Sequence, residues 1–538
     1  MDLVIRHGIV IDGTGRPGAP ADVGVSSGRI VAVGDLRHTR AEQELEARGR
    51  IVAPGFIDMH THCDFTLFER PQADSYVLQG VTTVVVGNCG FSPAPLSPDR
   101  REEVRRLVAL FDGELPWSWS SFGEYLAALE RERPALNVAA LVGLGAVRLA
   151  AVGTARRPAT AGEVARMQEL VRAALRDGAV GVSTGLIYPP GSFADTEEIV
   201  AVVSAARLEG GFYASHIRGE GHTLVEAVRE ALEIGRRTGL PVHISHLKAA
   251  GRRNWGKVAE VLRLLDEARA TQEVTFDQYP YTAGSTLLAA GLPPWVHEGG
   301  MEAVLARLRV REARDRICAE IARGLPGWHN LLGEAGWDRV YIANNAGRPE
   351  WNGLTLEEIG RLWGRSPCEA ALDLLLLSGG AVGMVLDMMS EEDVRAAMQH
   401  PLMQVGSDGW VLGPYGRNAH ARPHPRSYGT FPRLLGRYVR DAGLLSLEEA
   451  VARMTSRPAR RLGLGDRGVI RPGMAADLVV FDPDRVIDTA TYRDPHRYPE
   501  GIVATVVNGQ VVALDGQLTG ARPGRVLRRS GPSATHGP

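Results

Sequence analysis

The sequence predicts an α/β protein: a (β/α)8 barrel of the TIM type, a small β-sandwich domain built from both termini, and an insertion between strands seven and eight. Three observations support this fold class. Eight apolar runs of strand length alternate with helical stretches. Both ends of the chain carry strand patterns and little helix. The chain has 538 residues with 44% apolar side chains, enough for a large barrel and an accessory domain. An open doubly wound sheet is the alternative, but no glycine-rich phosphate loop follows the first strand.

The two ends of the chain read as short strands separated by turns. Their strand runs are 2–11, 22–33, 468–473, 476–481 and 502–513. Asn508-Gly509 divides the last run and is a typical hairpin turn. We therefore expect residues 1–53 and 465–520 to form one β-sandwich domain. Residues 521–538 are rich in Arg, Pro, Gly and Ser and are expected to be a loosely ordered tail.

Residues 54–464 are expected to form the barrel. The candidate strands, beginning at the edge of the first domain, are Ile51–Ile57, Thr82–Val86, Asn137–Val142, Gly178–Ser183, Gly211–Ser215, Pro241–Ser245, Val274–Gln278 and Met403–Gly406. The clearest helices between them are Ala161–Arg176, Asp195–Leu208, Thr223–Arg237 and Trp255–Ala270. Residues 285–400 are too long for a plain loop, so we interpret them as an inserted lid or subdomain with its own helices, Leu354–Trp363 and Pro367–Leu377.

Composition argues against several classes of partner. The net charge is −2 with acids and bases mixed, which argues against nucleic acid and membrane surfaces. No apolar run approaches the ~20 residues of a membrane span. The start shows no secretory signal, and four cysteines do not make a disulfide framework in so long a chain, so a cytoplasmic location is expected. A monomer and a homodimer both fit the sequence.

Metal-competent residues follow the candidate barrel strands. His60 and His62 close the first strand, and residues two apart on a strand face the same side. An isolated His-x-His is equally well read as two polar residues leaving a strand. Further residues of this kind end other strands: Cys89, His216, His246 and Asp408. The carboxyl ends of barrel strands share one face, and a mixed imidazole, thiol and carboxylate set favours zinc.

These motifs resemble the amidohydrolase superfamily, whose members are metal hydrolases with a (β/α)8 barrel. Many members bridge two metals through a lysine on strand four. Here strand four has none, because Lys248 and Lys257 are the only lysines, and Cys89 fills the gap. The longer motifs that resemble the D-aminoacylases (N-acyl-D-amino-acid deacylases) are Gly87-Asn-Cys-Gly-Phe-Ser92, Ser183-Thr-Gly-Leu-Ile-Tyr-Pro-Pro-Gly191, Ser215-His-Ile-Arg-Gly-Glu220, Ser245-His-Leu-Lys248 and His424-Pro-Arg-Ser-Tyr-Gly-Thr-Phe431.

The resemblance implies a function and a set of site residues. It implies zinc-dependent hydrolysis of the amide bond of a small-molecule N-acyl-D-amino acid. By this resemblance, Cys89, His216 and His246 are expected to form a tight zinc site, and His60, His62 and Asp408 a second, weaker one. Asp408 is also expected to be the catalytic proton carrier. Lys248, Tyr279 and Arg426 are expected to bind the substrate α-carboxylate. The D configuration rests on the resemblance alone.

Two other functions stay open. One is a cyclic amidase of the hydantoinase or dihydroorotase kind, against which the absent strand-four lysine counts. The other is a catalytically inactive barrel that serves as a scaffold, although all six metal-competent residues are present.

The loop after strand seven bears on the choice of amino acid. It carries Leu287, Leu288, Leu292 and Trp295 and no basic residue, and it leaves the barrel at the catalytic face. An acidic side chain would need a cation in its pocket. We therefore expect apolar N-acyl-D-amino acids to be preferred.

Overall fold

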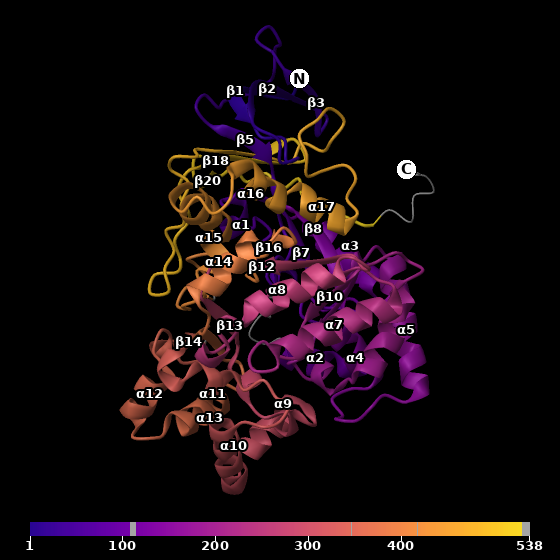
Figure 1. The fold of residues 1–538 in the computed structure, drawn as a ribbon, viewed down its shortest axis with the longest axis vertical. Helices are drawn as coiled ribbons and strands as arrows, with labels where there is room; N and C mark the ends of the chain where they lie inside the picture. The colour runs from indigo at the N-terminus through magenta and orange to yellow at the C-terminus, as the bar shows by residue number, and fades with distance from the viewer. Residues whose placement is uncertain (108–114, 346, 417, 530–538) are drawn as a thin grey trace.

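The computed structural model describes residues 1–107, 115–345, 347–416 and 418–529. Three sheets organise the chain: one from both termini, the barrel sheet, and a small sheet in the insertion. Figure 1 shows the terminal sheet at one end of the molecule, the barrel in the middle and the insertion at the other end. The predicted fold class is confirmed. No helix in the described residues is long and apolar enough to cross a membrane.

Eight parallel strands form the barrel, in the order β16-β12-β11-β10-β9-β8-β7-β6. They are β6 (Phe56–Asp58), β7 (Val81–Val86), β8 (Asn137–Gly143), β9 (Gly181–Gly185), β10 (Tyr213–His216), β11 (Val242–Ile244), β12 (Val274–Gln278) and β16 (Met403–Val405). The peptide N–H of Met59 donates to Val405 at 3.1 Å, and a parallel bridge pairs Thr61 with Gly409, so β16 meets β6. This contact brings the first and last strand ends together.

Helices surround these strands. They are α1 (Asp74–Val77), α2 (Arg101–Leu107), α3 (Phe122–Arg131), α4 (Leu144–Ala151), α5 (Ala161–Arg176), α6 (Thr196–Val203), α7 (Leu224–Thr238), α8 (Lys257–Ala268), α14 (Glu391–Gln399), α15 (Arg426–Arg433), α16 (Leu447–Met454) and α17 (Ser456–Leu462). The helix α5 begins as the sequence predicts, because Thr160 and Glu163 form a reciprocal capping box. Its apolar side chains Met167, Val171 and Leu175 are buried.

The predicted strand Ile51–Ile57 is wrong as a single element, because it divides at Gly55. Its first half, β5 (Ile51–Pro54), belongs to the terminal sheet, and only β6 belongs to the barrel. A Cβ atom at Gly55 would lie 2.2 Å from the Thr82 side chain, so the chain passes the next barrel strand where only glycine fits.

The terminal sheet has nine strands from both ends of the chain, with the path β20-β19-β18-β17-β5-β1-β2-β3 and β4 beside β1. The N-terminal ones are β1 (Leu3–Val10), β2 (Ala19–Ser26), β3 (Arg29–Gly34) and β4 (Gln43–Glu46). The C-terminal ones are β17 (Leu478–Phe481), β18 (Ile502–Val507), β19 (Gln510–Leu514) and β20 (Gln517–Leu518). The expected strand at 468–473 is absent, because that stretch forms turns.

Residues 521–529 correct the expectation of a loose tail. Leu527 donates its N–H to the carbonyl of Val138 at 2.7 Å, and Val138 donates to Arg525 at 2.9 Å. Val526 and Leu527 are buried against the barrel. Residues 530–538, the rest of the predicted tail, lie outside the described residues.

The insertion between β12 and β16 has its own antiparallel sheet and apolar core. Its strands are β13 (Ala283–Leu287), β14 (Val340–Asn344) and β15 (Gly383–Asp387), in the order β13-β15-β14. Its helices are α9 (Gly300–Leu308), α10 (Arg311–Arg323), α11 (Leu331–Ala335), α12 (Leu356–Trp363) and α13 (Pro367–Leu377). The two predicted helices are therefore present: α13 has the predicted ends, and α12 begins two residues later than predicted.

Two cysteines in the insertion form a disulfide that the sequence did not predict. Cys318 on α10 and Cys368 on α13 are bonded across 50 residues of chain. Their separation in sequence gave no indication of pairing, because only the packing of α10 on α13 brings them together. Cys63 and Cys89 are free and buried.

Candidate functional site

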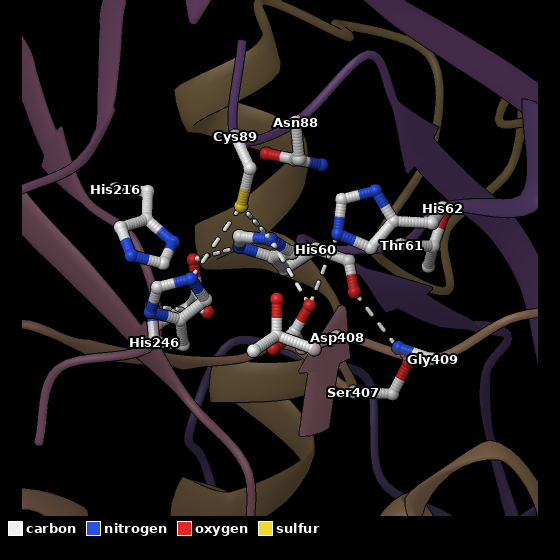
Figure 2. A network of polar contacts seen from close by, with 12 residues as sticks. His60, Thr61, His62, Asn88, Cys89, His216, His246, Ser407, Asp408 and Gly409 are labelled. Carbon is white, nitrogen blue, oxygen red and sulfur yellow. Dashed lines mark hydrogen bonds and ion pairs between the residues drawn. The ribbon is translucent and has the colours of Figure 1, made fainter. Parts of the chain in front are cut away.

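The six predicted metal-competent residues converge at the carboxyl ends of the barrel strands. Figure 2 shows the side chains of His60, His62, Cys89, His216, His246 and Asp408 directed toward one space. Their exposed fractions range from 0% for His60 to 7% for His62 and Asp408. Two sets have donor atoms within 4.8 Å of one another. One is His60, Cys89, His246 and Asp408, and the other is His216, Glu220 and His246.

A strained turn aims Cys89 into this space. Cys89 has a φ of 55°, and Gly87 has a φ of 76° with a Leu141 carbonyl 1.9 Å from where its Cβ would be. Ser183 on β9 holds the turn from both sides: it donates to the Gly87 carbonyl and accepts from the Gly90 N–H at 3.0 Å. A backbone strained in this way at a cleft is typical of functional sites.

The Cys89 thiol lies between two imidazoles. Its Sγ is 3.2 Å from Nε2 of His60 and 3.5 Å from Nε2 of His246. Burial alone would raise the pKa of the Cys89 thiol, but the positive charges of His60 and His246 lower it well below its usual range. The sulfur is therefore a thiolate, the form that binds metals.

Asp408 lies between two imidazoles on one side and a guanidinium on the other. Its Oδ1 is 3.2 Å from Nε2 of His62 and 3.5 Å from Nε2 of His60, and its Oδ2 forms a 2.9 Å ion pair with Arg426. Its N–H donates to the carbonyl of His60 at 2.7 Å, which fixes the side chain beside both histidines. Burial would raise the pKa of this carboxyl, but Arg426 and the imidazoles hold it well below its usual range. Asp408 is therefore ionised and able to accept a proton.

Lys248, Tyr279 and Arg426 lie on the neighbouring wall, all at most 4% exposed. The Arg426 guanidinium stacks 4.8 Å from the centre of the Tyr279 ring and donates to the Ser285 carbonyl at 3.2 Å. The Lys248 ammonium is 5.7 Å from the same ring. The Tyr279 hydroxyl is buried without a hydrogen-bond partner. Two cations and one unpaired hydroxyl donor thus lie on the wall beside Asp408.

Glu220 and Asp277 were missed by the sequence reasoning. Glu220 accepts hydrogen bonds from Lys248 at 2.5 Å and contacts Nδ1 of His246 at 3.0 Å. Asp277 on β12 contacts Nδ1 of His60 at 3.2 Å and accepts a hydrogen bond from the backbone N–H of His246 at 2.9 Å. Both are buried, and both orient imidazoles whose other nitrogen faces Cys89. The signal for Asp277 was a carboxylate inside an apolar strand.

The donor atoms of Cys89, His216 and His246 fit a zinc ion. A tetrahedral zinc with one sulfur and two nitrogen ligands places those atoms about 3.5 Å apart, and the Cys89–His246 separation is 3.5 Å. Both ring nitrogens of His216 are buried without a hydrogen-bond partner, and burial lowers the pKa of His216, which keeps it neutral and able to bind a metal. The pair of His60 and His62 with Asp408 offers a second group of nitrogen and oxygen donors.

The predicted substrate-contacting leucines are only partly at the site. Leu287 is half-buried at the end of β13, and Leu288 and Leu292 are buried within the core of the insertion. Trp295 donates to Glu320 at 2.6 Å and stacks under Arg316. The expectation that all four border the substrate is therefore wrong for these three, because the insertion needs them for its own core.

Comparisons with known proteins agree with the geometry. A family model described as "Amidohydrolase family" matches residues 43–513. The chain is 39% identical to a D-aminoacylase of Alcaligenes xylosoxydans xylosoxydans over 98% of both chains. It is 41% identical to an N-acyl-D-glutamate deacylase of the same organism, over 98% of this chain and 97% of that one. An N-acyl-D-glutamate deacylase from Bordetella bronchiseptica, solved with zinc and a phosphonate mimic of the tetrahedral intermediate, superposes with a TM-score of 0.83 at 40% identity, over 98% of this chain and 99% of that one.

The geometry predicts that Cys89 anchors the metal. Cys89→Ala should lose most of the bound divalent metal, because it removes the thiolate that His60 and His246 face. Metal analysis of the purified protein measures this directly. Cys63→Ala is the matched control, because that thiol is also buried, next to His62 in the chain, yet lies outside both donor groups. Full metal content in Cys89→Ala would contradict the assignment.

Proposed function

Because this chain belongs to the amidohydrolase family, we propose that it is a zinc-dependent hydrolase that cleaves N-acyl-D-amino acids into a carboxylic acid and a free D-amino acid. The observation that carries the proposal is Asp408, an ionised carboxylate held between the His60 and His62 imidazoles and the Arg426 guanidinium. It places a proton acceptor and an anion-binding group on the two sides of one metal-competent space.

The amino-acid end of the substrate is assigned to Arg426, Lys248 and Tyr279. A guanidinium binds a carboxylate through two parallel hydrogen bonds. Arg426 already faces one carboxylate, Asp408, and rests on the Tyr279 ring, so an incoming α-carboxylate meets a cation that is fixed in place. The free Tyr279 hydroxyl is a further donor. Substrate binding thus positions the scissile amide next to Asp408.

The chemistry then needs one proton carrier. A bound zinc ion lowers the pKa of a water molecule to about 7 and polarises a carbonyl group. Cys89, His216 and His246 would hold the tight ion, and His60, His62 and Asp408 a weaker second one. Asp408 accepts the proton of the attacking water as the water oxygen bonds to the carbonyl carbon. It then donates that proton to the nitrogen as the C–N bond breaks, which gives the acid and the amine.

Glu220 has a positioning part in this scheme. It is the partner of both Lys248 and His246, and the charge of Lys248 offsets the burial that would otherwise raise the pKa of Glu220, so that this pKa lies well below its usual range. An ionised Glu220 keeps His246 oriented with Nε2 toward Cys89.

The first prediction concerns Asp408. Asp408→Asn preserves the shape but carries no transferable proton, so kcat should fall at least about 100-fold while the zinc of the tight site is retained. Steady-state kinetics on an N-acetyl-D-amino acid, paired with metal analysis, tests this. A variant that keeps more than about a tenth of wild-type kcat would assign the proton transfer to another group.

The second prediction concerns Arg426. Arg426→Ala should raise KM roughly 10- to 100-fold for N-acyl-D-amino acids, because a charge-assisted hydrogen bond is lost. Substrates whose α-carboxylate is replaced by an amide should be poor for the wild type and little changed in the variant. Arg433→Ala is the control, since Arg433 is on the same helix but faces Asp488 and Tyr281. Equal losses on both kinds of substrate would make Arg426 a structural residue.

The third prediction concerns the released amino acid. The pocket around Arg426 is lined by small neutral groups, among them Ser285, Ala343 and Gly383, and Arg426 is the only cation among its described lining residues. Lys248, the other cation assigned to the α-carboxylate, is already paired with Glu220, so an acidic side chain would have to compete with the α-carboxylate for Arg426. We therefore expect apolar N-acetyl-D-amino acids to exceed N-acetyl-D-glutamate and N-acetyl-D-aspartate at least tenfold in kcat/KM. The reverse preference would refute the neutral pocket, and faster turnover of L-enantiomers would refute the stereochemistry.

A further inference from the structure

We propose that a second, apolar cavity on the far side of the metal-competent residues binds the acyl chain, so that medium-length or aromatic acyl groups, rather than acetyl, are the preferred substrates. This inference rests on the proposed function. The cavity has a volume of about 140 Å³ and lies between the insertion and the loops after β7 and β9. Among the described residues, none lines both this cavity and the pocket around Arg426.

The wall of this cavity is continuous with the metal-competent residues. Phe91 packs with its ring centre 6.2 Å from that of His62, and Tyr188 packs 5.0 Å from His216. The two aromatic rings are 4.9 Å apart and both line the cavity. The cavity therefore lies behind the Phe91 and Tyr188 rings, which separate it from His62 and His216, where the carbonyl of a bound amide would be held.

The strand β13 connects the two pockets. Ser285 lines the pocket around Arg426, and Leu287, two residues further along the same face, lines the apolar cavity. Thr286, on the opposite face, contacts the Tyr188 hydroxyl at 2.9 Å and fixes that ring against the strand. A substrate that lies along β13 would thus reach from the cation at one end to the apolar cavity at the other.

Connectivity decides which part of the substrate reaches the cavity. The amino-acid side chain and the carboxylate branch from one carbon, so the side chain stays close to the group that Arg426 holds. The acyl chain begins at the carbonyl carbon, on the other side of the amide nitrogen. A cavity that backs onto His62 and His216 and has no described residue in common with the Arg426 pocket is therefore on the acyl side.

The electrostatics of the cavity agree with a neutral, apolar guest. Its described lining residues include no lysine or arginine, and of its two acidic side chains, Glu103 and Glu302, the first is paired with Arg100 at 3.1 Å. Burial lowers the pKa of His297, also in the lining, to about 4, so this imidazole is uncharged at neutral pH. A carboxylate would find no cation among the described lining residues. Apolar cavities of similar volume take a guest of about six carbons, which is about the size of the alkyl chain of a hexanoyl group or the ring of a phenylacetyl group.

The test is a chain-length series on one amino acid. With N-acyl-D-leucines from acetyl to octanoyl, plus phenylacetyl, kcat/KM of the zinc-loaded wild type should rise roughly three- to fourfold for each buried methylene up to hexanoyl. Hexanoate should likewise inhibit more strongly than acetate. A flat or falling series with measurable turnover overturns the acyl cavity alone. Absence of turnover on every member overturns the proposed function and this inference with it.

A filled cavity separates acyl binding from side-chain binding. Ala381 lines the cavity and is only half-buried. Ala381→Phe should lower the ratio of hexanoyl to acetyl kcat/KM at least tenfold. The matched control is Ala322→Phe on the exposed side of α10, which should leave that ratio unchanged. The ratio of N-acetyl-D-leucine to N-acetyl-D-alanine should not respond to Ala381→Phe. If that ratio falls and the acyl ratio does not, the cavity holds the amino-acid side chain and the proposal is wrong. If Ala381→Phe does not fold, the wild-type series and the inhibition by free acids decide.

Discussion

The closure of the barrel between β16 and β6 is the contact on which the site depends. Residues about 350 positions apart in the chain meet there, and the hydrogen bond from the Asp408 N–H to the His60 carbonyl joins the last site residue directly to the first. A buried carboxylate, Asp58, accepts from the N–H groups of both His60 and Ser407 and supports the same seam. Without this seam Asp408 would have no fixed place between the histidines, and the ion pair with Arg426 would not point into the site.

The site also balances its buried charges. Imidazoles, Lys248 and Arg426 are interleaved with Cys89, Glu220, Asp277 and Asp408, so each charged group has an opposite partner within hydrogen-bond or ion-pair distance. Removing one member of such a set costs more than one contact, because it leaves a buried charge without its partner. This explains why the site is preorganised by residues that contact no substrate.

The sequence predicted those parts of the structure that follow local rules. Strand-end residues such as His216 and His246 could be identified because alternation and barrel topology place them on one face. The helix α5 was predicted with its correct ends, because its capping box and apolar periodicity depend only on residues close together in the sequence. What the sequence could not show depended on packing between distant segments. The division of β5 from β6 needs the contact of Gly55 with Thr82, and the Cys318–Cys368 bond needs the packing of two helices. Glu220 and Trp295 both lie in loops, and the sequence does not indicate which of them belongs to the site. Their contacts in the structure do: Glu220 faces His246, and Trp295 faces Glu320 in the insertion.

The division at Gly55 has a consequence for the modular character of the enzyme. The chain leaves β5 of the terminal sheet and enters β6 of the barrel after a single glycine, and β17 from the other end pairs with β5 over Ile51–Pro54. The terminal sheet is therefore not an appended module with a linker. It fixes the start of the first barrel strand, and so also the position of the two histidines that follow the end of that strand. A recombination of this barrel with the accessory sheet of a relative would have to exchange both chain ends together.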